Sequence, residues 1–275
     1  MHRLNLPFLL LLICVICACT SIPEQYTDLD VRTFDVADSE SILIRVDYGE
    51  VTVLESDDAY VIVDGQVLFA DRLEYQVSTI EEHHEIKVFA HRDNLSSPPL
   101  RVFVHVPKQM QVKVETDDAS ILVQDYHGDV EIASLSGNIG VERVTGVLTL
   151  RSNRGSITVR ESSGDIGIVG NYGALTAQNV HGDLSVSTIM GNILFDGLIQ
   201  DGDDIRLEAD HGSVSVILNA DSDLSLQVRS TSGDVACMLP GMTSTTRTCD
   251  GELKVNGGIL SIRTVSGAVT LQATP

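Results

Sequence analysis

The stretch that decides the fold begins at residue 128 and reads GDVEIASLSGNIGVERVTGVLTLRSNRGSITVRESSG, and its spacing continues to residue 195. Glycine recurs every nine residues in this stretch, at positions 128, 137, 146, 155, 164, 173, 182 and 191. A constant period over eight units is typical of a repeat architecture. The stretch therefore predicts a fold built from stacked units of one kind.

Each nine-residue unit carries the pattern of a short strand. The residues two and four positions after the glycine are apolar in all eight units, and seven of the eight residues between them are polar or glycine. This alternation is typical of a strand with one buried face. We expect one strand and one corner per unit, with the glycine in a left-handed or otherwise Cβ-intolerant conformation at the corner.

The number of strands in one coil follows from the distance at which units resemble each other. The unit GNIGV at 137–141 returns three units later as GDIGI at 164–168, and GVLTL at 146–150 returns three units later as GALTA at 173–177. At a distance of two units the corresponding segments read GSITV at 155–159 and GDIGI at 164–168, which we take as the weaker likeness. We therefore predict an all-β fold, a single-stranded parallel-type β-solenoid (β-helix) with about three short strands per coil, and keep two strands per coil as the alternative.

The chain divides into four parts on these patterns. Residues 31–115 alternate apolar and polar residues without the nine-residue period and are expected to form the β-rich N-terminal part or cap of the solenoid. Residues 116–275 are expected to form the solenoid repeats, although the glycine spacing loosens beyond residue 191. Residues 1–18 are predicted to be a signal peptide and residues 19–30 a lipidated tether.

The N-terminal residues indicate export. One basic residue, Arg3, precedes an unbroken apolar run from Phe8 to Ala18, and a helix of that length would rise only about 16 Å, roughly half of a bilayer core. The run ends at Cys19 in a pattern that resembles the bacterial lipoprotein signal. We expect lipidation of Cys19 and attachment to a membrane through this lipid. Ordinary cleavage near Ala18, which would release a soluble secreted protein, is the alternative.

The remaining cysteines fit an exported protein. Removal of the signal and acylation of Cys19 would leave Cys237 and Cys249 as the only pair in the mature chain. Export permits a disulfide between them, which would contribute on the order of 3 kcal/mol for a loop of about a dozen residues. Two free buried thiols are the alternative.

The charge balance narrows the classes of partner. The chain has 39 acidic and 18 basic side chains, a net charge of −21, and no Trp among 12 aromatic residues. Affinity for phosphate depends on Lys and Arg, so this balance argues against nucleic acid as a partner and against an anionic bilayer bound by charge alone. The acidic residues are expected mostly on corners and outward strand positions, where they keep a repetitive β protein soluble.

Several acidic residues and histidines invite comparison with β-helical polysaccharide hydrolases. Such enzymes bring two carboxyl groups and often a histidine to one face. Here Asp203, Asp204 and His211 would have to converge in one groove, while Asp117 and Asp118 form a second acidic pair. Few aromatic residues are available to stack on a sugar ring, and we predict no catalytic residues.

Metal binding is not predicted either. Asp201–Asp204 lacks the glycine and the bidentate Glu of a calcium-binding EF-hand loop, and the residue after each periodic glycine varies too much for a calcium ladder. The histidines at 83, 84 and 91 lie among acidic residues and are interpreted as part of an exposed polar loop. No metal and no cofactor are expected.

The layout resembles the bacterial "putative adhesin" β-strand repeat family, also called toast-rack domains. The resemblance rests on an early YGEVTV strand at 48–53, RVFVHVPK at 101–108, Ser-Gly-Asp units such as 163–166 and 232–235, and a closing VSGAVTL at 265–271. The family implies a β-repeat fold and no established catalytic residues.

We therefore expect a non-enzymatic lipoprotein of the bacterial cell envelope, located outside the cytoplasm. Its acidic solenoid would serve adhesion, scaffolding or interaction with an envelope protein or glycan. The alternatives are a β-helical enzyme acting on an envelope polysaccharide and a structural solenoid that self-assembles through open strand edges.

Overall fold

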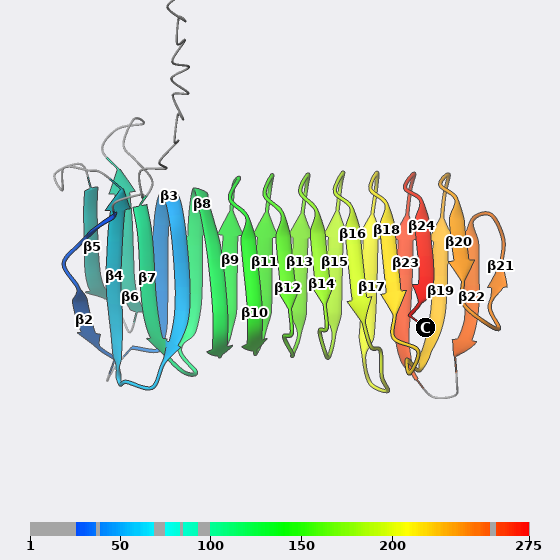
Figure 1. Cartoon of the computed structure of the whole chain (residues 1–275), viewed down its shortest axis with the longest axis horizontal. Coiled ribbons are helices and arrows are strands. Elements are labelled where there is room, and N and C mark those ends of the chain that lie inside the picture. The colour runs from blue at the N-terminus through cyan, green and yellow to red at the C-terminus, as the bar shows by residue number, and fades with distance from the viewer. Residues whose placement is uncertain are drawn as a thin grey trace, which may run out of the picture.

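The computed structural model describes residues 26–36, 39–68, 75–82, 85–92, 100–253 and 257–274. The fold is all-β, with 66% strand and a mostly parallel sheet that curves nearly 339° round an axis. Figure 1 shows an elongated body along which the strands lie side by side. Within the described ranges, no helix is long and apolar enough to cross a membrane.

The N-terminal end is built from long strands and antiparallel neighbours. Its strands are β1 (Tyr26–Asp28), β2 (Arg32–Asp35), β3 (Ser41–Ser56), β4 (Tyr60–Leu68), β5 (Tyr75–Glu82), β6 (Glu85–Arg92), β7 (Leu100–Pro107) and β8 (Gln111–His127). Strands β3 and β8 run parallel, and β3 also pairs in parallel with β6 and β7. Strand β4 is antiparallel to β1, β2 and β7, and β5 is antiparallel to β6. Antiparallel strands therefore close this end.

The nine-residue units and the two strands that follow them form the regular middle of the molecule. Its strands are β9 (Val130–Ser134), β10 (Ile139–Thr145), β11 (Leu148–Ser152), β12 (Ile157–Arg160), β13 (Ile166–Gly170), β14 (Leu175–Gln178), β15 (Leu184–Thr188), β16 (Ile193–Gly197), β17 (Asp204–Ala209) and β18 (Val214–Leu218). The prediction of three strands per coil is wrong, because Ile139 pairs with Ile157 and Leu148 with Ile166, in each case two units along the chain. Each coil therefore contains two strands, as the alternative had it.

The likeness at three units misled because it compared strands of opposite layers. Both layers need only apolar residues at their inward positions, so strand sequences do not reveal the period. The two corners do differ. At one corner the buried residue stands three positions before the glycine, as in Ser134 and Ser152, and at the other it stands two positions before it, as in Tyr126 and Val144. This alternation repeats in every second unit and so reports the true coil.

The periodic glycines also form two groups, one at each corner. Both expected reasons for glycine are found, a positive φ angle and a lack of space for a Cβ atom. Gly146, Gly164 and Gly182 have positive φ angles of 151°, 128° and 99°. At the other corner, Gly155 has no positive φ, but a Cβ atom there would lie 1.9 Å from the carbonyl oxygen of Gly137 in the preceding coil. One corner therefore needs glycine for its backbone conformation as well as for space, and the other for close approach of neighbouring coils.

The C-terminal strands do not follow chain order in space. They are β19 (Leu224–Ser230), β20 (Val235–Met238), β21 (Thr243–Ser244), β22 (Thr248–Leu253), β23 (Gly258–Thr264) and β24 (Val269–Ala273). Strand β23 lies between β17 and β19, and β24 lies between β18 and β20 (Figure 1). Antiparallel β22 then covers β19, with β21 beside it. The end of the chain thus fills an interior coil, and a hairpin covers the last one.

The inward residues of both layers form one hydrophobic core, filled mainly by Val, Ile and Leu. Tyr126 and Phe195 are its largest fully buried side chains. The Tyr126 hydroxyl donates to the carbonyl oxygens of Met110 and, at 3.3 Å, Pro107, and burial raises its pKa above the ordinary value. The thin core needs few aromatic residues, which accounts for their scarcity in the sequence.

Candidate functional site

The turns at the upper edge of Figure 1 share a five-residue motif that ends in glycine. Its first, third and fourth residues point outward and its second residue is buried. The seven copies are ASLSG (133–137), RSNRG (151–155), VGNYG (169–173), STIMG (187–191), EADHG (208–212), RTVSG (263–267) and RSTSG (229–233). The fold therefore fixes two of the five residues and leaves three facing solvent.

A buried hydroxyl closes most of these turns. Ser152 and Thr188 each accept a hydrogen bond at 2.9 Å from the backbone N–H of the glycine three positions later. Thr264 donates at 3.0 Å to the carbonyl oxygen of Gly267. Because the hydroxyl satisfies a backbone group inside the turn, the outward residues are not needed for that purpose.

We call the outward residues of these turns, together with those of 115–119 in β8, the corner surface. Strand pairing sets its order along the molecule as β8, β9, β11, β13, β15, β17, β23 and β19. Neighbouring turns of the corner surface lie one strand spacing apart, about 4.8 Å. Residues far apart in the sequence, such as Glu208 and Arg263, are therefore neighbours on this surface.

A hollow of about 520 Å³ lies under the N-terminal half of the corner surface. It is lined by Arg45, Glu115, Ala133, Arg151 and Asn153, among others. Arg45 forms an ion pair with Glu115, with an Nε–Oε2 distance of 3.2 Å, and the hydrogen bond from Arg45 holds the pKa of Glu115 below its ordinary value. The short side chain of Ala133 stands between Glu115 and Arg151 in the strand register, which leaves the space open.

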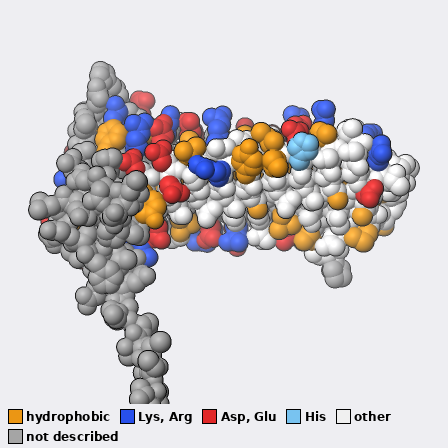
Figure 2. Space-filling view, turned by 90° about the horizontal axis from the view of Figure 1, so that it is seen from above, with side chains coloured by type: hydrophobic (Ala, Val, Ile, Leu, Met, Phe, Trp, Pro, Cys, Tyr) orange, Lys and Arg blue, Asp and Glu red, His pale blue; other side chains and the backbone are white. Residues whose placement is uncertain are grey.

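Large apolar side chains are exposed at the middle of the corner surface. Val169, Tyr172, Ile189 and Met190 are 43%, 59%, 45% and 56% exposed. They belong to the neighbouring turns after β13 and β15. Figure 2 shows a group of hydrophobic side chains near the middle of this edge, with Lys or Arg side chains beside it. Grouped exposed apolar residues of this kind are typical of interaction sites.

Opposite charges flank this apolar group. Arg151 and Arg154 lie on the coil before it, and Glu208 and Asp210 lie on the coil after it. None of these four side chains forms an ion pair with another described residue. Several arginines elsewhere are paired, such as Arg143, whose Nε lies 2.5 Å from an Asp125 carboxylate oxygen. The charged groups beside the apolar centre are therefore available to a partner.

The residues considered for polysaccharide hydrolysis do not converge. Asp203 and Asp204 lie at the start of β17, and His211 follows its end, which puts about 20 Å of extended chain between them. Asp203 accepts hydrogen bonds from the backbone N–H of Gly182 and Gln200, and His211 contacts Ser266 at 2.8 Å. The structure assigns these side chains to turns at opposite edges of the sheet.

Acidic residues after the periodic glycines have a structural task that the sequence interpretation missed. Asp129 accepts a hydrogen bond at 2.9 Å from the backbone N–H of Val147 in the next coil, and Asp183 accepts one at 3.0 Å from that of Asp204. Two asparagines at the same position, Asn138 and Asn192, do the same for Ser156 and Ser213. The recurrence of Asp and Asn at this position was the available signal.

No group of three or more His, Cys, Asp or Glu in the described part of the chain is placed to hold a metal ion. The histidines at 83 and 84 lie outside the described residues, and the side chain at 91 is not described.

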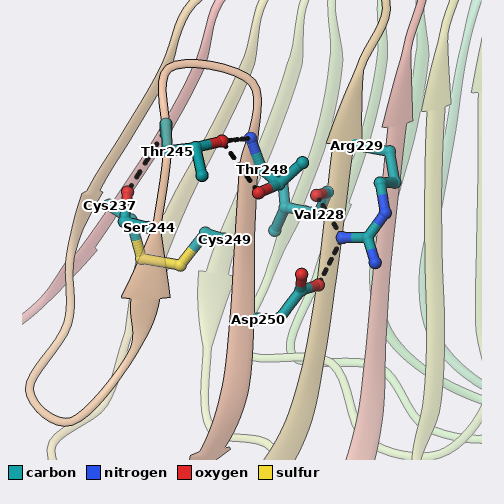
Figure 3. The surroundings of a disulfide bond; sticks show 8 residues. All are labelled: Val228, Arg229, Cys237, Ser244, Thr245, Thr248, Cys249 and Asp250. Carbon is teal, nitrogen blue, oxygen red and sulfur yellow. Dashed lines mark hydrogen bonds and ion pairs between the residues drawn. A yellow bond between two sulfur atoms is a disulfide. The ribbon is translucent and has the colours of Figure 1, made fainter.

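Cys237 and Cys249 form a disulfide between β20 and β22, with the two Cα atoms 6.2 Å apart (Figure 3). The pairing expected from the sequence is thus present, and it ties the covering hairpin to the last coil. Close to the disulfide, Arg229 of β19 forms an ion pair with Asp250 of β22. In the same hairpin, the hydroxyl groups of Thr245 and Thr248 form a hydrogen bond of 2.9 Å. Cys19 lies outside the described residues, so its lipidation stays a prediction.

The sequence of this chain matches the model of a known protein family. Residues 40–272 match the model described as Toastrack DUF4097. The chain belongs to the Toastrack DUF4097 family. The toast-rack resemblance of the sequence is thereby confirmed, and the match covers both the N-terminal strands and the repeats.

Several solved structures are similar to this Toastrack chain. A "putative adhesin" from Bacteroides fragilis is 10% identical, with a TM-score of 0.49, and the match covers 90% of this chain and 97% of that one. A "putative adhesin" from Parabacteroides merdae is 12% identical, with a TM-score of 0.44 and coverages of 90% and 96%. A "putative lipid binding protein" from Parabacteroides distasonis is 14% identical, with a TM-score of 0.47 and coverages of 88% and 96%. No curated protein matches the chain.

The corner surface is the feature that sequence reasoning missed. Its signal was the five-residue motif with a hydroxyl or small residue at the second position and glycine at the fifth, which recurs at every second corner of the regular repeats. Grouping units by this motif separates the two corners and brings the tyrosine, methionine and arginine positions onto one edge of the Toastrack fold.

Proposed function

We propose that the chain is a non-enzymatic lipoprotein of the bacterial cell envelope, whose β-solenoid presents the corner surface for binding to another envelope component. The observation that carries this proposal is the apolar group of Val169, Tyr172, Ile189 and Met190, which is exposed between charged side chains that have no ion-pair partner among the described residues. These apolar side chains are not among the buried residues of the core, and exposure of grouped large apolar side chains is typical of interaction sites.

A location outside the cytoplasm is supported by the disulfide between Cys237 and Cys249, because disulfides persist mainly in oxidising compartments. The N-terminal apolar run and Cys19 provide the means of attachment. Replacement of Cys19 by Ser in the full chain should move the protein from the membrane fraction to the soluble fraction. Mass spectrometry should find a diacylglyceryl group on Cys19 of the unsubstituted protein, and an unmodified Cys19 would refute the anchor.

The enzymatic alternative lacks the arrangement it requires. The sequence interpretation required Asp203, Asp204 and His211 to converge in one groove, whereas β17 separates the two acidic residues from the histidine. End-to-end assembly is also disfavoured, because antiparallel β4 and β22 interrupt the parallel register at the two ends.

The binding role can be tested by removing the apolar group. A full-length Tyr172→Ser, Met190→Ser variant should lose at least tenfold of its capture by intact envelope extract, measured as chemically cross-linked complexes. A matched control is Val147→Ser, Met238→Ser, which removes side chains that are 48% and 61% exposed away from the corner surface. Equal capture by both variants would refute binding through the corner surface.

A further inference from the structure

The corner surface is self-complementary, and we propose that its partner is a second copy of this chain. The two copies would lie with their long axes antiparallel, related by a two-fold axis that passes midway between β13 and β15. This inference rests on the binding role proposed for the corner surface and names the partner. A two-fold interface requires that each residue meet the image of another residue on the same surface.

The centre of such an interface would be apolar. The two-fold places the turn after β13 of one copy against the turn after β15 of the other. Tyr172 of each copy then meets Met190 of the second copy, because both stand at the fourth position of their turns, and Val169 and Ile189 lie beside this contact. All four are exposed by more than two fifths in the single chain. Burial of large apolar side chains at the centre of an interface supplies most of its binding energy.

The next coils on either side would pair opposite charges. The turn after β11 carries Arg151 and Arg154, and the two-fold places it against the turn after β17 of the second copy, which carries Glu208 and Asp210. The contact occurs twice, once on each side of the axis. None of these side chains has an ion-pair partner among the described residues of its own chain. Association would therefore supply the partners that the single chain does not.

The complementarity extends one coil further. The turn after β9 would meet the turn after β23, so that Leu135 lies opposite Val265. These side chains are 46% and 38% exposed, and both are apolar residues on the outward side of a turn. Three successive pairs of turns, from β9 to β23, thus set apolar residues against apolar residues or opposite charges against each other under a single symmetry operation; Arg263, which falls opposite Ala133, stands outside this match.

Other arrangements of two copies lose this match. If the long axes were parallel and in register, Arg151 and Arg154 would face their own copies, and so would Glu208 and Asp210, which is repulsive at both places. A shift of one coil in the antiparallel arrangement would set either the arginines or the acidic residues against the apolar group. The charge pattern therefore selects one orientation and one register.

The interface would be long and narrow. From β9 to β23 there are five strand spacings, about 24 Å in total, and a single edge of the molecule makes the contact. Such an area falls below the roughly 800 Å² per partner of a typical stable interface. We expect an association that depends strongly on protein concentration and that is favoured when both copies are held at one membrane.

Charge reversal tests the proposed pairing. One full-length variant carries Arg151→Glu and Arg154→Glu, and a second carries Glu208→Arg and Asp210→Arg. Each alone would set like charges against each other, so its dimer dissociation constant should rise at least tenfold in sedimentation velocity experiments in detergent. A mixture of the two variants should restore association, because both charge contacts between unlike copies then set acidic residues against arginines. Arg247→Glu, at an exposed position of the C-terminal hairpin, is the control and should associate as the unsubstituted chain does.

Cross-linking tests the orientation. Full-length Leu135→Cys and Val265→Cys variants, mixed and treated with a short bismaleimide, should form a cross-linked pair. Leu135→Cys alone should not, because the two copies of residue 135 would lie about 24 Å apart. Cross-linking of Leu135→Cys to itself, or failure of the charge-reversed mixture to associate, would overturn the proposal. An unsubstituted chain that stays monomeric at all concentrations, yet still needs Tyr172 and Met190 for capture, would overturn only the identity of the partner.

Discussion

Replacement of Gly155 by Ala should open the stack of coils at one corner. The φ angle of Gly155 is not positive, so the backbone conformation itself would accept alanine. A Cβ atom would, however, lie 1.9 Å from the carbonyl oxygen of Gly137 and 2.9 Å from that of Ser136. Both are backbone atoms of the preceding coil, so no side-chain rotation can relieve the contact.

The cost follows from the distance by which the coils must separate. Bringing the Cβ atom to even 3.0 Å from the Gly137 oxygen requires a shift of about 1.1 Å. The neighbouring bonds from Asn153 N–H to Ser134 O and from Arg154 N–H to Leu135 O are each 3.1 Å, and such a shift takes both beyond hydrogen-bonding range. Loss of two or three bonds at about 1 kcal/mol each lowers the free energy of unfolding by about 2–3 kcal/mol.

A matched control separates close approach from the general effect of replacing glycine. At Gly167, in the middle of β13, a Cβ atom would meet only the Leu148 carbonyl oxygen at 3.8 Å. Gly167→Ala should leave stability unchanged or raise it by about 0.5–1 kcal/mol, because alanine restricts the unfolded chain.

The assay is denaturant unfolding followed both by circular dichroism and by tyrosine fluorescence, because agreement of two probes checks two-state behaviour in a repeat protein. We expect a clear loss of stability for Gly155→Ala and none for Gly167→Ala. Equal midpoints for Gly155→Ala and the unsubstituted chain would refute the argument that glycine at this corner serves close packing.

Three other substitutions test single interactions. Replacement of Cys237 and Cys249 by Ser should lower the free energy of unfolding by about 3 kcal/mol, and a reducing agent should lower the melting temperature of the unsubstituted chain but not that of the variant. Tyr126→Phe should cost about 1 kcal/mol in the same unfolding assay, and an unchanged midpoint would show that the buried hydroxyl bonds contribute nothing. Because Arg45 lowers the pKa of Glu115, the ion pair should stabilise the protein above the ordinary pKa of Glu and lose this effect as the pH falls through the lowered pKa. The stability difference between the unsubstituted chain and Glu115→Gln, which should stay within about 1 kcal/mol, should therefore be present at pH 7 and shrink as the pH falls below the ordinary pKa of Glu; a difference independent of pH would count against the ion pair.

The strands were predictable from the sequence because inward positions tolerate only apolar residues. The rule that residues two and four positions after each glycine point inward holds from Val130 and Ile132 to Ile193 and Phe195, all of which are buried. The coil length was not predictable from the same residues, because strands of both layers obey the same rule.

The C-terminal order was also beyond the reach of sequence pattern. The segments at 258–264 and 269–273 read as further repeats, and their strands are indeed parallel members of the stack. All of these strands carry the same alternation of apolar and polar residues. That alternation therefore does not specify which strand pairs with which. Strand β23 lies between β17 and β19, after a covering hairpin of β21 and β22 whose antiparallel pairing has no counterpart in the repeat.

The chemistry of the corner surface is not a by-product of the fold. In each five-residue turn the second residue is buried and the glycine admits the next coil, while the other three side chains face water and are free to vary. In a chain with 39 acidic and 18 basic residues, outward positions would be expected to carry scattered acids. Among them stand two arginines, then four apolar residues, then two acids, on consecutive coils, and the remaining outward positions of these four turns carry Asn153, Asn171, Ser187 and His211. Because neither stacking nor solubility requires this order, a surface that must match its own image explains it better than the solvation of a repeat protein does.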